Sequence, residues 1–161
     1  MLGLVEAYSP AQRAFRPAPQ SWSMLDVINH LVLSEYGSYR FIAVQRDPAR
    51  MPATLLWHHP LRKILMIVSL RVPVKFRKPA KIPEPQTEKD LQQLRHEWQE
   101  IQCKMQAFAE AQDEAFFTVP VLIHPFFGYL SLASTLRFFI EHIHHHCKQI
   151  TRIAQANGFP R

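Results

Sequence analysis

The chain contains little glycine, little cysteine and no long apolar run. Only 4 glycines stand against 13 prolines in 161 residues, which argues against an all-β fold because such folds need many glycine turns. The two cysteines, Cys103 and Cys147, form no Cys-x-x-Cys pair, so we expect a reducing compartment rather than a disulfide scaffold. The longest apolar stretch, residues 64–70, is shorter than the roughly 18 residues that a bilayer requires. The first residues also lack the features of a signal peptide, so we expect a cytoplasmic protein without a transmembrane segment.

Acidic residues are absent from residues 48–83, which nevertheless contain eight Lys and Arg residues. Since the net charge of the whole chain is +6, the basic surface is local rather than general. We interpret this segment as a solvated basic crossover loop. Its aromatic residues, Trp57 and Phe76, are too few for a base-stacking platform, so we do not expect nucleic-acid binding. Contact with an anionic partner such as a membrane surface is the alternative for this segment.

What the chain does contain is enough apolar material for one core. Hydrophobic residues make up 47% of the sequence, with 11 Phe and 3 Trp, which predicts a single domain over residues 1–161. Ser23 with Asp26 predicts a capping box that starts an amphipathic helix of about 20 residues. Thr87 with Asp90 predicts a second box and a long helix to about residue 112.

The last helix is predicted from Ser131 to about Asn157, with Gly158 as its stop signal. The remaining segments are predicted to be short or irregular: residues 1–8 as the tail of a helix, 9–20 as a loop, 61–70 as a short helix, 71–86 as an extended crossover and 116–130 as a loop. These elements predict an all-α fold. We expect a four-helix bundle with a shortened first helix and a long crossover between helices 2 and 3.

Histidines are the most informative residues of the sequence. Nine are present, and four of them fall within residues 141–150, EHIHHHCKQI. On a helical wheel, His142 and His146 share one face with apolar residues, whereas His144 points away. Two imidazoles spaced by four residues can converge on one metal ion at about 2.0–2.1 Å. His145 and Gln149 flank the pair and are candidates for supporting or substrate-contacting groups.

His30 is the best candidate for a third ligand, because it lies in the middle of the first long helix on an apolar face. Helical bundles build metal sites from side chains on facing helices in this way. The alternative is that His30 is a core histidine with one hydrogen bond. The remaining histidines are expected to lie in loops or on a helix surface and not to bind a metal: His58, His59, His96 and His124.

Two longer stretches resemble a known family. Residues 17–35, PAPQSWSMLDVINHLVLSE, and residues 124–150, HPFFGYLSLASTLRFFIEHIHHHCKQI, are similar to motifs of the DinB-like (DinB/YfiT) superfamily of metal-dependent enzymes, and KFRKPAKIP is a weaker third match. The resemblance implies a four-helix bundle in up-down-down-up order and a divalent metal held by His30, His142 and His146. The first helix is shorter than in the family, which is compatible with a truncated start or with closure by a short element and a homodimer partner.

A three-histidine site leaves coordination positions open for water or substrate. Zinc suits imidazole best, with nickel and iron as alternatives. Two chemistries are open: a hydrolase that activates water, or a transferase that uses a low-molecular-weight thiol co-substrate, each acting on a small molecule. His145 and Gln149 are the candidate catalytic residues, whereas Glu35 is predicted to point away and Cys147 to be a packed thiol. The alternative function is a non-enzymatic binding or structural protein with a structural or empty metal site.

Overall fold

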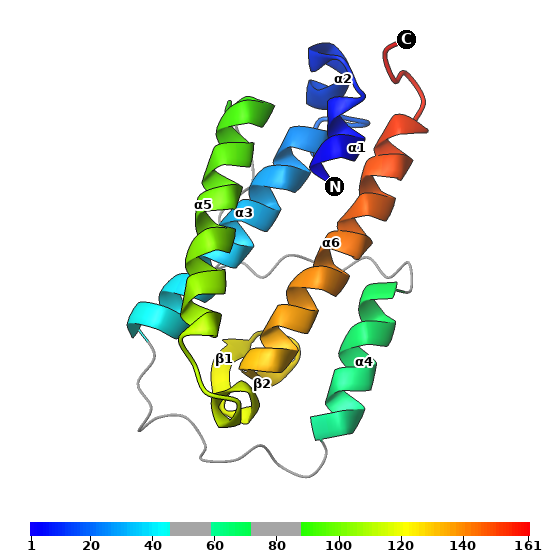
Figure 1. Cartoon of the computed structure of the whole chain (residues 1–161). Coiled ribbons are helices and arrows are strands. Elements are labelled where there is room, and N and C mark those ends of the chain that lie inside the picture. The colour runs from blue at the N-terminus through cyan, green and yellow to red at the C-terminus, as the bar shows by residue number, and fades with distance from the viewer. Residues whose placement is uncertain (46–58, 72–87) are drawn as a thin grey trace.

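The computed structural model describes residues 1–45, 59–71 and 88–161 of the chain (Figure 1). These residues are mostly helical, which confirms the expected helical class, and they include one antiparallel strand pair that was not expected. The elements in chain order are α1 (Leu2–Glu6), α2 (Pro10–Ala14), α3 (Met24–Arg40), the π-helical turn η1 (Phe41–Gln45), α4 (His59–Arg71), α5 (Leu91–Glu110), the 3₁₀ turn η3 (Ala115–Thr118), β1 (Pro120–His124), β2 (Gly128–Ser131) and α6 (Leu132–Ala154).

Helix α3 begins at the predicted capping box. The Ser23 hydroxyl accepts the amide hydrogen of Asp26, and the Asp26 carboxylate accepts the amide hydrogen of Ser23 at 2.7 Å. Arg16 pairs with the same carboxylate at 2.8 Å, which ties the segment before the helix to its first turn. These contacts fix where α3 starts and therefore the position of His30 along the helix and of Trp22 just before it.

The predicted start of the next long helix was three residues too early. Its N-cap is Asp90, which forms a capping box with Gln93, and the helix begins at Leu91. Asp90 caps more favourably than Thr87 would, because Gln93 supplies the reciprocal acceptor three residues later. Thr87 itself lies outside the described residues.

Two segments predicted to be loops contain regular structure. Helix α2 lies within residues 9–20, where Ser9 and Gln12 form a capping box and Pro10 occupies the first helical turn. Residues 120–131 form a hairpin in which Leu122 pairs with Leu130. The prolines misled the prediction, because Pro120 and Pro125 stand at the start of a strand and in the turn, where the missing amide hydrogen is tolerated.

Helices α4 and α6 differ from their predictions mainly in length. Helix α4 covers the expected short helix and is longer at its N-terminal end. Helix α6 begins at Leu132, one residue after the predicted start, with Ser131 as its N-cap; it ends at Ala154, and Gly158, with φ of 77°, lies in the turn beyond it. Apart from Arg71, the predicted extended crossover lies outside the described residues.

Helix α3 contacts both α5 and α6, and α4 packs along α6 near the hairpin (Figure 1). Two clusters of buried side chains result. The first, here called the terminus-side core, lies near both chain ends and comprises Val5, Met24, Val27, Ile28, Leu31, Val32, Leu91, Leu94, Trp98, Ile101, Ile150 and Ile153. The second, the hairpin-side core, comprises Ile42, Met66, Leu70, Met105, Val121, Leu122, Leu130, Leu132, Phe138 and Phe139.

The C-terminal end of α4 is attached to α6 by polar contacts. The Nδ1 atom of His145 lies 3.0 Å from the carbonyl oxygen of Leu70, and the Lys148 ammonium donates to the carbonyl oxygen of Arg71 at 2.8 Å. Carbonyl groups in the last turn of a helix have no partner within the helix, so α6 satisfies groups that α4 cannot. A donor with positive charge is also favourable at that end of the helix dipole.

In the part of the chain that the structure describes, no helix has both the length and the apolar character that a membrane crossing requires.

Candidate metal centre

Three histidines from two helices meet between α3 and α6. The Nε2 atom of His142 lies 3.0 Å from Nε2 of His146 and 3.3 Å from Nε2 of His30. Each ring offers one nitrogen to a group whose atoms all lie within 4.8 Å of one another. The structure thus brings together the three residues that the sequence selected, although His30 and His142 are 112 positions apart.

The spacing of these nitrogens fits a bound metal ion. With metal–nitrogen distances of about 2.0–2.1 Å in a tetrahedral arrangement, neighbouring ligand nitrogens lie about 3.3 Å apart. The separations of His142 Nε2 from the other two Nε2 atoms, 3.0 and 3.3 Å, come within a few tenths of an ångström of that value. Three imidazole nitrogens are also a donor set that suits zinc, nickel or iron. The residues present therefore fit a divalent ion.

Burial keeps two of the rings neutral. It lowers the pKa of His142 well below its usual value, and the neighbouring His146 and His30 lower it further. Burial, followed by the charge of His30, lowers the pKa of His146 to about 3, although the hydrogen bond that His146 donates to Gln149 acts in the opposite direction. A neutral imidazole retains the lone pair that a metal needs, so both rings are in the binding form at neutral pH.

Gln149 orients one of the rings. Its side-chain oxygen lies 2.8 Å from Nδ1 of His146. An amide oxygen only accepts hydrogen bonds, so Nδ1 of His146 carries the hydrogen and Nε2 presents its lone pair to the cluster. Gln149 thus occupies the place beside the histidine pair that the helical wheel predicted, in the manner of a group that orients a metal ligand.

Two aromatic side chains flank the cluster. The Trp22 ring, in the segment before α3, lies 5.0 Å from the ring of His30 and 6.3 Å from that of His146. Phe138 stacks on His142 at 4.9 Å with an interplanar angle of 21°. Neither residue was predicted from the sequence to belong to the site. The signal for Phe138 was its spacing of one helical turn from His142.

His145 points toward α4. Its Nδ1 atom contacts the Leu70 carbonyl, and its ring centroid lies 5.2 Å from that of His146. Because a carbonyl oxygen accepts, Nδ1 of His145 carries a hydrogen. The catalytic role suggested for His145 stays a prediction. His144 is exposed, as the wheel predicted.

Glu35 lies against α5 rather than in the histidine cluster, as its position on the wheel suggested. Its carboxyl group is buried, and burial raises its pKa to about 7, although the neighbouring Trp98 and Gln102 side chains act in the opposite direction. Of the two cysteines, Cys103 is exposed and Cys147 is half-buried, which agrees with the expected packed thiol at Cys147.

His124 lies closer to the cluster than the sequence suggested. It stands at the end of β1, where its Nδ1 atom accepts the amide hydrogens of Phe126 and Phe127 at 3.2 and 3.3 Å. Its ring lies 4.7 Å from Phe138, and burial lowers its pKa to about 4. His124 is therefore neutral at physiological pH and one aromatic ring away from His142. The histidine–proline pair at the hairpin turn was the available signal.

The other histidines not expected to bind metal have varied positions. His96 is exposed on α5, as predicted. His59 begins α4 rather than lying in a loop. His58 lies outside the described residues.

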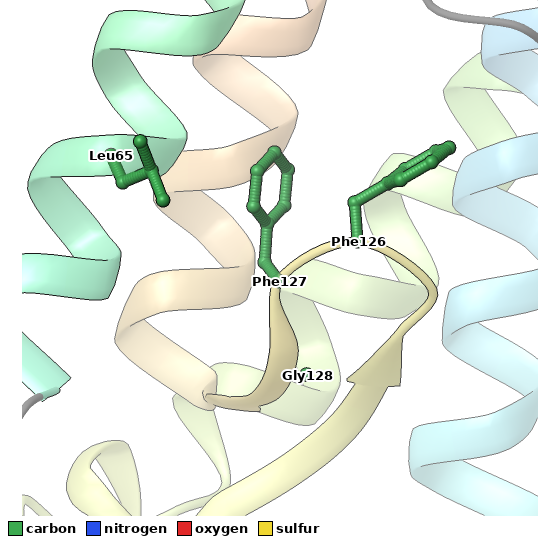
Figure 2. A pocket seen from close by; sticks show the side chains of 4 residues that line it. All are labelled: Leu65, Phe126, Phe127 and Gly128. Atoms are coloured by element: carbon green, nitrogen blue, oxygen red, sulfur yellow. The ribbon is translucent and has the colours of Figure 1, made fainter.

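A shallow apolar pocket lies between α4 and the hairpin turn. In the view of Figure 2, the Phe127 ring rises from the turn between the Leu65 side chain and the Phe126 ring. The pocket has a volume of about 170 Å³ and is lined by Leu65, Phe126, Phe127 and Gly128. Its lining does not include the three clustered histidines. The aromatic contacts of Phe127 with His124, and of His124 with Phe138, connect its wall to the centre.

Comparison with known proteins supports the resemblance noted in the sequence. A family model described as the DinB superfamily matches residues 1–150, a range that contains all three clustered histidines. The same comparisons found no match among curated proteins or solved structures. Because the family match covers most of the chain, the protein belongs to the DinB superfamily.

Proposed function

We propose that the protein is a metal-dependent enzyme that acts on a small molecule, with His30, His142 and His146 as the ligands of one divalent ion. The observation that carries this proposal is the convergence of three imidazole nitrogens from two helices in a buried cluster. Burying three rings edge to edge is costly unless their polar atoms have a partner, and a shared cation is the partner that all three can use.

The chain's own residues prepare the centre in three ways. Gln149 holds His146 in the tautomer that presents Nε2 to the ion. Trp22 and Phe138 cover the rings and restrict the approach of water. His145 donates from Nδ1 to the Leu70 carbonyl, and we assign the transfer of a proton to its other ring nitrogen, Nε2. When bound, the ion would supply Lewis acidity toward water or toward a thiol.

Both reaction classes suggested by the sequence remain part of the proposal: a hydrolase, or a transferase with a low-molecular-weight thiol as co-substrate. We propose zinc as the ion, because it favours tetrahedral imidazole ligation. We also propose that the helices form a four-helix bundle in up-down-down-up order, and that the protein is a cytoplasmic homodimer.

A structural metal site is the second candidate function. The observation that favours it is that the apolar pocket beside the hairpin is lined by residues other than the three histidines. An ion at this centre would join α3 to α6, which is what a structural site does. The two candidates differ in what loss of the ion should change.

Metal binding can be followed through Trp22. Protein without a histidine tag is titrated with Co²⁺, which quenches a nearby tryptophan, while bound metal is counted by mass spectrometry. We expect one ion per chain, and we expect His30→Ala to weaken binding about 100-fold or more, since it removes one of three ligands. Trp22→Phe should remove most of the quenching while the metal content stays the same.

His96→Ala is the matched control, because it removes an exposed histidine from α5. If His30→Ala and His96→Ala bind Co²⁺ equally well, the assignment of the ligands is wrong. If His30→Ala loses the metal but keeps its melting temperature, the site is catalytic rather than structural. A large fall in melting temperature instead supports the structural candidate.

The reaction class is tested with zinc-loaded protein on two substrate panels, one of esters and amides and one of electrophiles supplied with low-molecular-weight thiols. Turnover on either panel that is lost in His30→Ala and kept in His96→Ala supports an enzyme. Turnover that survives in His30→Ala would contradict the role of this centre in the reaction.

A further inference from the structure

A buried carboxylate next to the candidate metal centre holds two arginines. The Glu141 side chain is fully buried. It accepts two hydrogen bonds from Arg71 of α4, through Nε and Nη2, both at 2.8 Å. Arg137, one turn earlier on α6, pairs with the same carboxylate at 2.6 Å. Glu141 therefore joins guanidinium groups from two helices at one place.

The charges at this place do not balance. Two guanidinium groups share one carboxylate, which leaves one positive charge in excess. Lys148, which is exposed and donates to the Arg71 carbonyl, adds another. Hydrogen bonds from Arg71 are the largest cause of the lowered pKa of Glu141, and Arg137 and His144 contribute through their charges. In the described residues, neither arginine is paired with a second carboxylate.

The two guanidinium groups retain unused hydrogen-bond donors. A guanidinium has five N–H groups; Arg71 uses two of them on Glu141, and Arg137 pairs through one nitrogen. Their side chains are 55% and 42% exposed, so the remaining donors are accessible. Both Nη2 atoms contact Oε1 of Glu141, so they must lie within two hydrogen-bond lengths of each other.

This arrangement has the properties of an anion-binding site. Planar guanidinium groups bind phosphate and carboxylate groups through paired hydrogen bonds. Holding both groups in place beforehand reduces the conformational entropy that binding would otherwise cost. A structural clamp between α4 and α6 would need only the Arg71 pair, and Arg137 adds a second guanidinium to the same carboxylate through an i,i+4 pair on α6.

We propose that Arg71 and Arg137, held by Glu141, bind the oxyanion of a phosphate-type ligand on the surface between α4 and α6. The site is separate from the histidine cluster, because successive residues of a helix point about 100° apart and Glu141 precedes His142. The proposal does not depend on a metal at that cluster.

The test is a calorimetric titration of metal-free full-length protein with inorganic phosphate at constant ionic strength. Removing metal beforehand excludes binding of phosphate to an ion at the histidines. We expect saturable binding of one phosphate per chain, with a dissociation constant on the order of 1 mM. Arg137→Gln should weaken binding at least about tenfold, and Arg137→Lys should restore part of it. Because Arg71 still pairs with Glu141 in these variants, their folds should be kept, which circular dichroism checks.

Arg152→Gln is the matched control, since Arg152 is exposed on the same helix and its removal changes the net charge equally. The proposal is overturned if phosphate does not saturate the protein, if Arg137→Gln binds it as well as the original chain does, or if Arg152→Gln weakens binding equally.

The source of the oxyanion is distinguished in two further arms. Glycerol phosphate is titrated in the same way, and sedimentation is measured with phosphatidylglycerol vesicles against phosphatidylcholine vesicles. Binding of glycerol phosphate that is weakened in Arg137→Gln assigns a soluble ligand. Retention on the anionic vesicles that is lost in Arg137→Gln and displaced by phosphate assigns a lipid headgroup.

Discussion

The terminus-side and hairpin-side cores are built from different material. The terminus-side core is mainly aliphatic and is supplied by long helices, with Leu94 and Ile28 fully buried. The hairpin-side core contains two methionines and the rings of Phe138 and Phe139, which lie 5.8 Å apart with their planes tilted by 55°, and much of it comes from short elements. Helix α6 is shared by both. The terminus-side core is thus stabilised by the packing of long helices, whereas the hairpin-side core is stabilised by contacts between short elements that are not stable alone.

The short elements have little stability of their own. A lone two-stranded hairpin is at best marginally stable in water, and a helix of 13 residues such as α4 is marginal without packing. We therefore expect the hairpin-side core to open locally at a lower free energy than the terminus-side core. The histidine cluster lies where the two meet, since Phe138 stacks on His142 and Ile150 follows His146 by one turn.

The largest expected effect comes from truncating one buried side chain in each core. Leu94→Ala should lower the free energy of unfolding by about 2–5 kcal/mol, because it leaves a cavity among long helices. Met66→Ala should change global unfolding less and should mainly increase amide exchange in α4 and the hairpin. Urea unfolding and hydrogen exchange measure the two effects.

Equal losses in urea unfolding, with no added exchange in α4 after Met66→Ala, would show that the two cores unfold as one unit. The two cores would then differ in composition but not in local stability.

A second effect concerns Glu35 of α3, which lies in the chain between Val32 of the terminus-side core and Ile42 of the hairpin-side core. Its pKa is raised from 4.5 to about 7, chiefly by burial, so the folded state holds the proton more tightly than the unfolded state. The stability due to the neutral carboxyl is complete below about pH 4.5 and is lost as the pH rises through about 7. Glu35→Gln should therefore stabilise the protein at pH 8 by up to about 3 kcal/mol.

Chemical denaturation of both proteins at pH 4.5 and pH 8 measures this difference. The gain should nearly vanish at the lower pH, where the glutamic acid is already neutral. A gain of the same size at both pH values would point to a packing effect and not to the charge of Glu35.

The smallest effect compares the two glycines with positive φ. Gly128 has φ of 69° in the hairpin, and Gly158 has φ of 77° beyond α6. An L-residue is strained in this region, so each Gly→Ala change should cost about 1 kcal/mol. We expect Gly128→Ala to increase hydrogen exchange in the hairpin-side core, and Gly158→Ala to affect only the packing near Phe15, whose ring is 3.9 Å from the added carbon. Melting temperatures with exchange measurements test both, and an indistinguishable exchange pattern would contradict the separation.

The sequence predicted the parts of the fold that depend on local signals. Helix α3 follows from the Ser23–Asp26 box and a repeated apolar face, and the histidine pair follows from the spacing of four residues. The hairpin was missed because its two prolines suggested a loop. A strand tolerates proline only at positions whose backbone amide donates no hydrogen bond. Those positions are set by the tertiary structure and cannot be read from the sequence. The N-cap of α5 was assigned to Thr87 and not to Asp90, because Thr87 with Asp90 and Asp90 with Gln93 both have the spacing of a capping box.

The surroundings of the site could not be predicted in the same way. Trp22 reaches the cluster because the segment before α3 folds back over His30, and no spacing along the chain encodes that contact. The Arg71–Glu141 pair joins residues 70 positions apart. Glu141 has an arginine four residues earlier on its own helix, but its burial arises only when α4 packs on α6.

The three histidines are divided between two helices, α3 and α6. Two of the nitrogens are fixed to α6 at a distance set by helix geometry alone, whereas the third moves with α3. The affinity for an ion bound by all three nitrogens therefore depends on the distance between α3 and α6. A change far from the histidines that widens this gap by a fraction of an ångström would register as weaker ligation before it registers as loss of the fold.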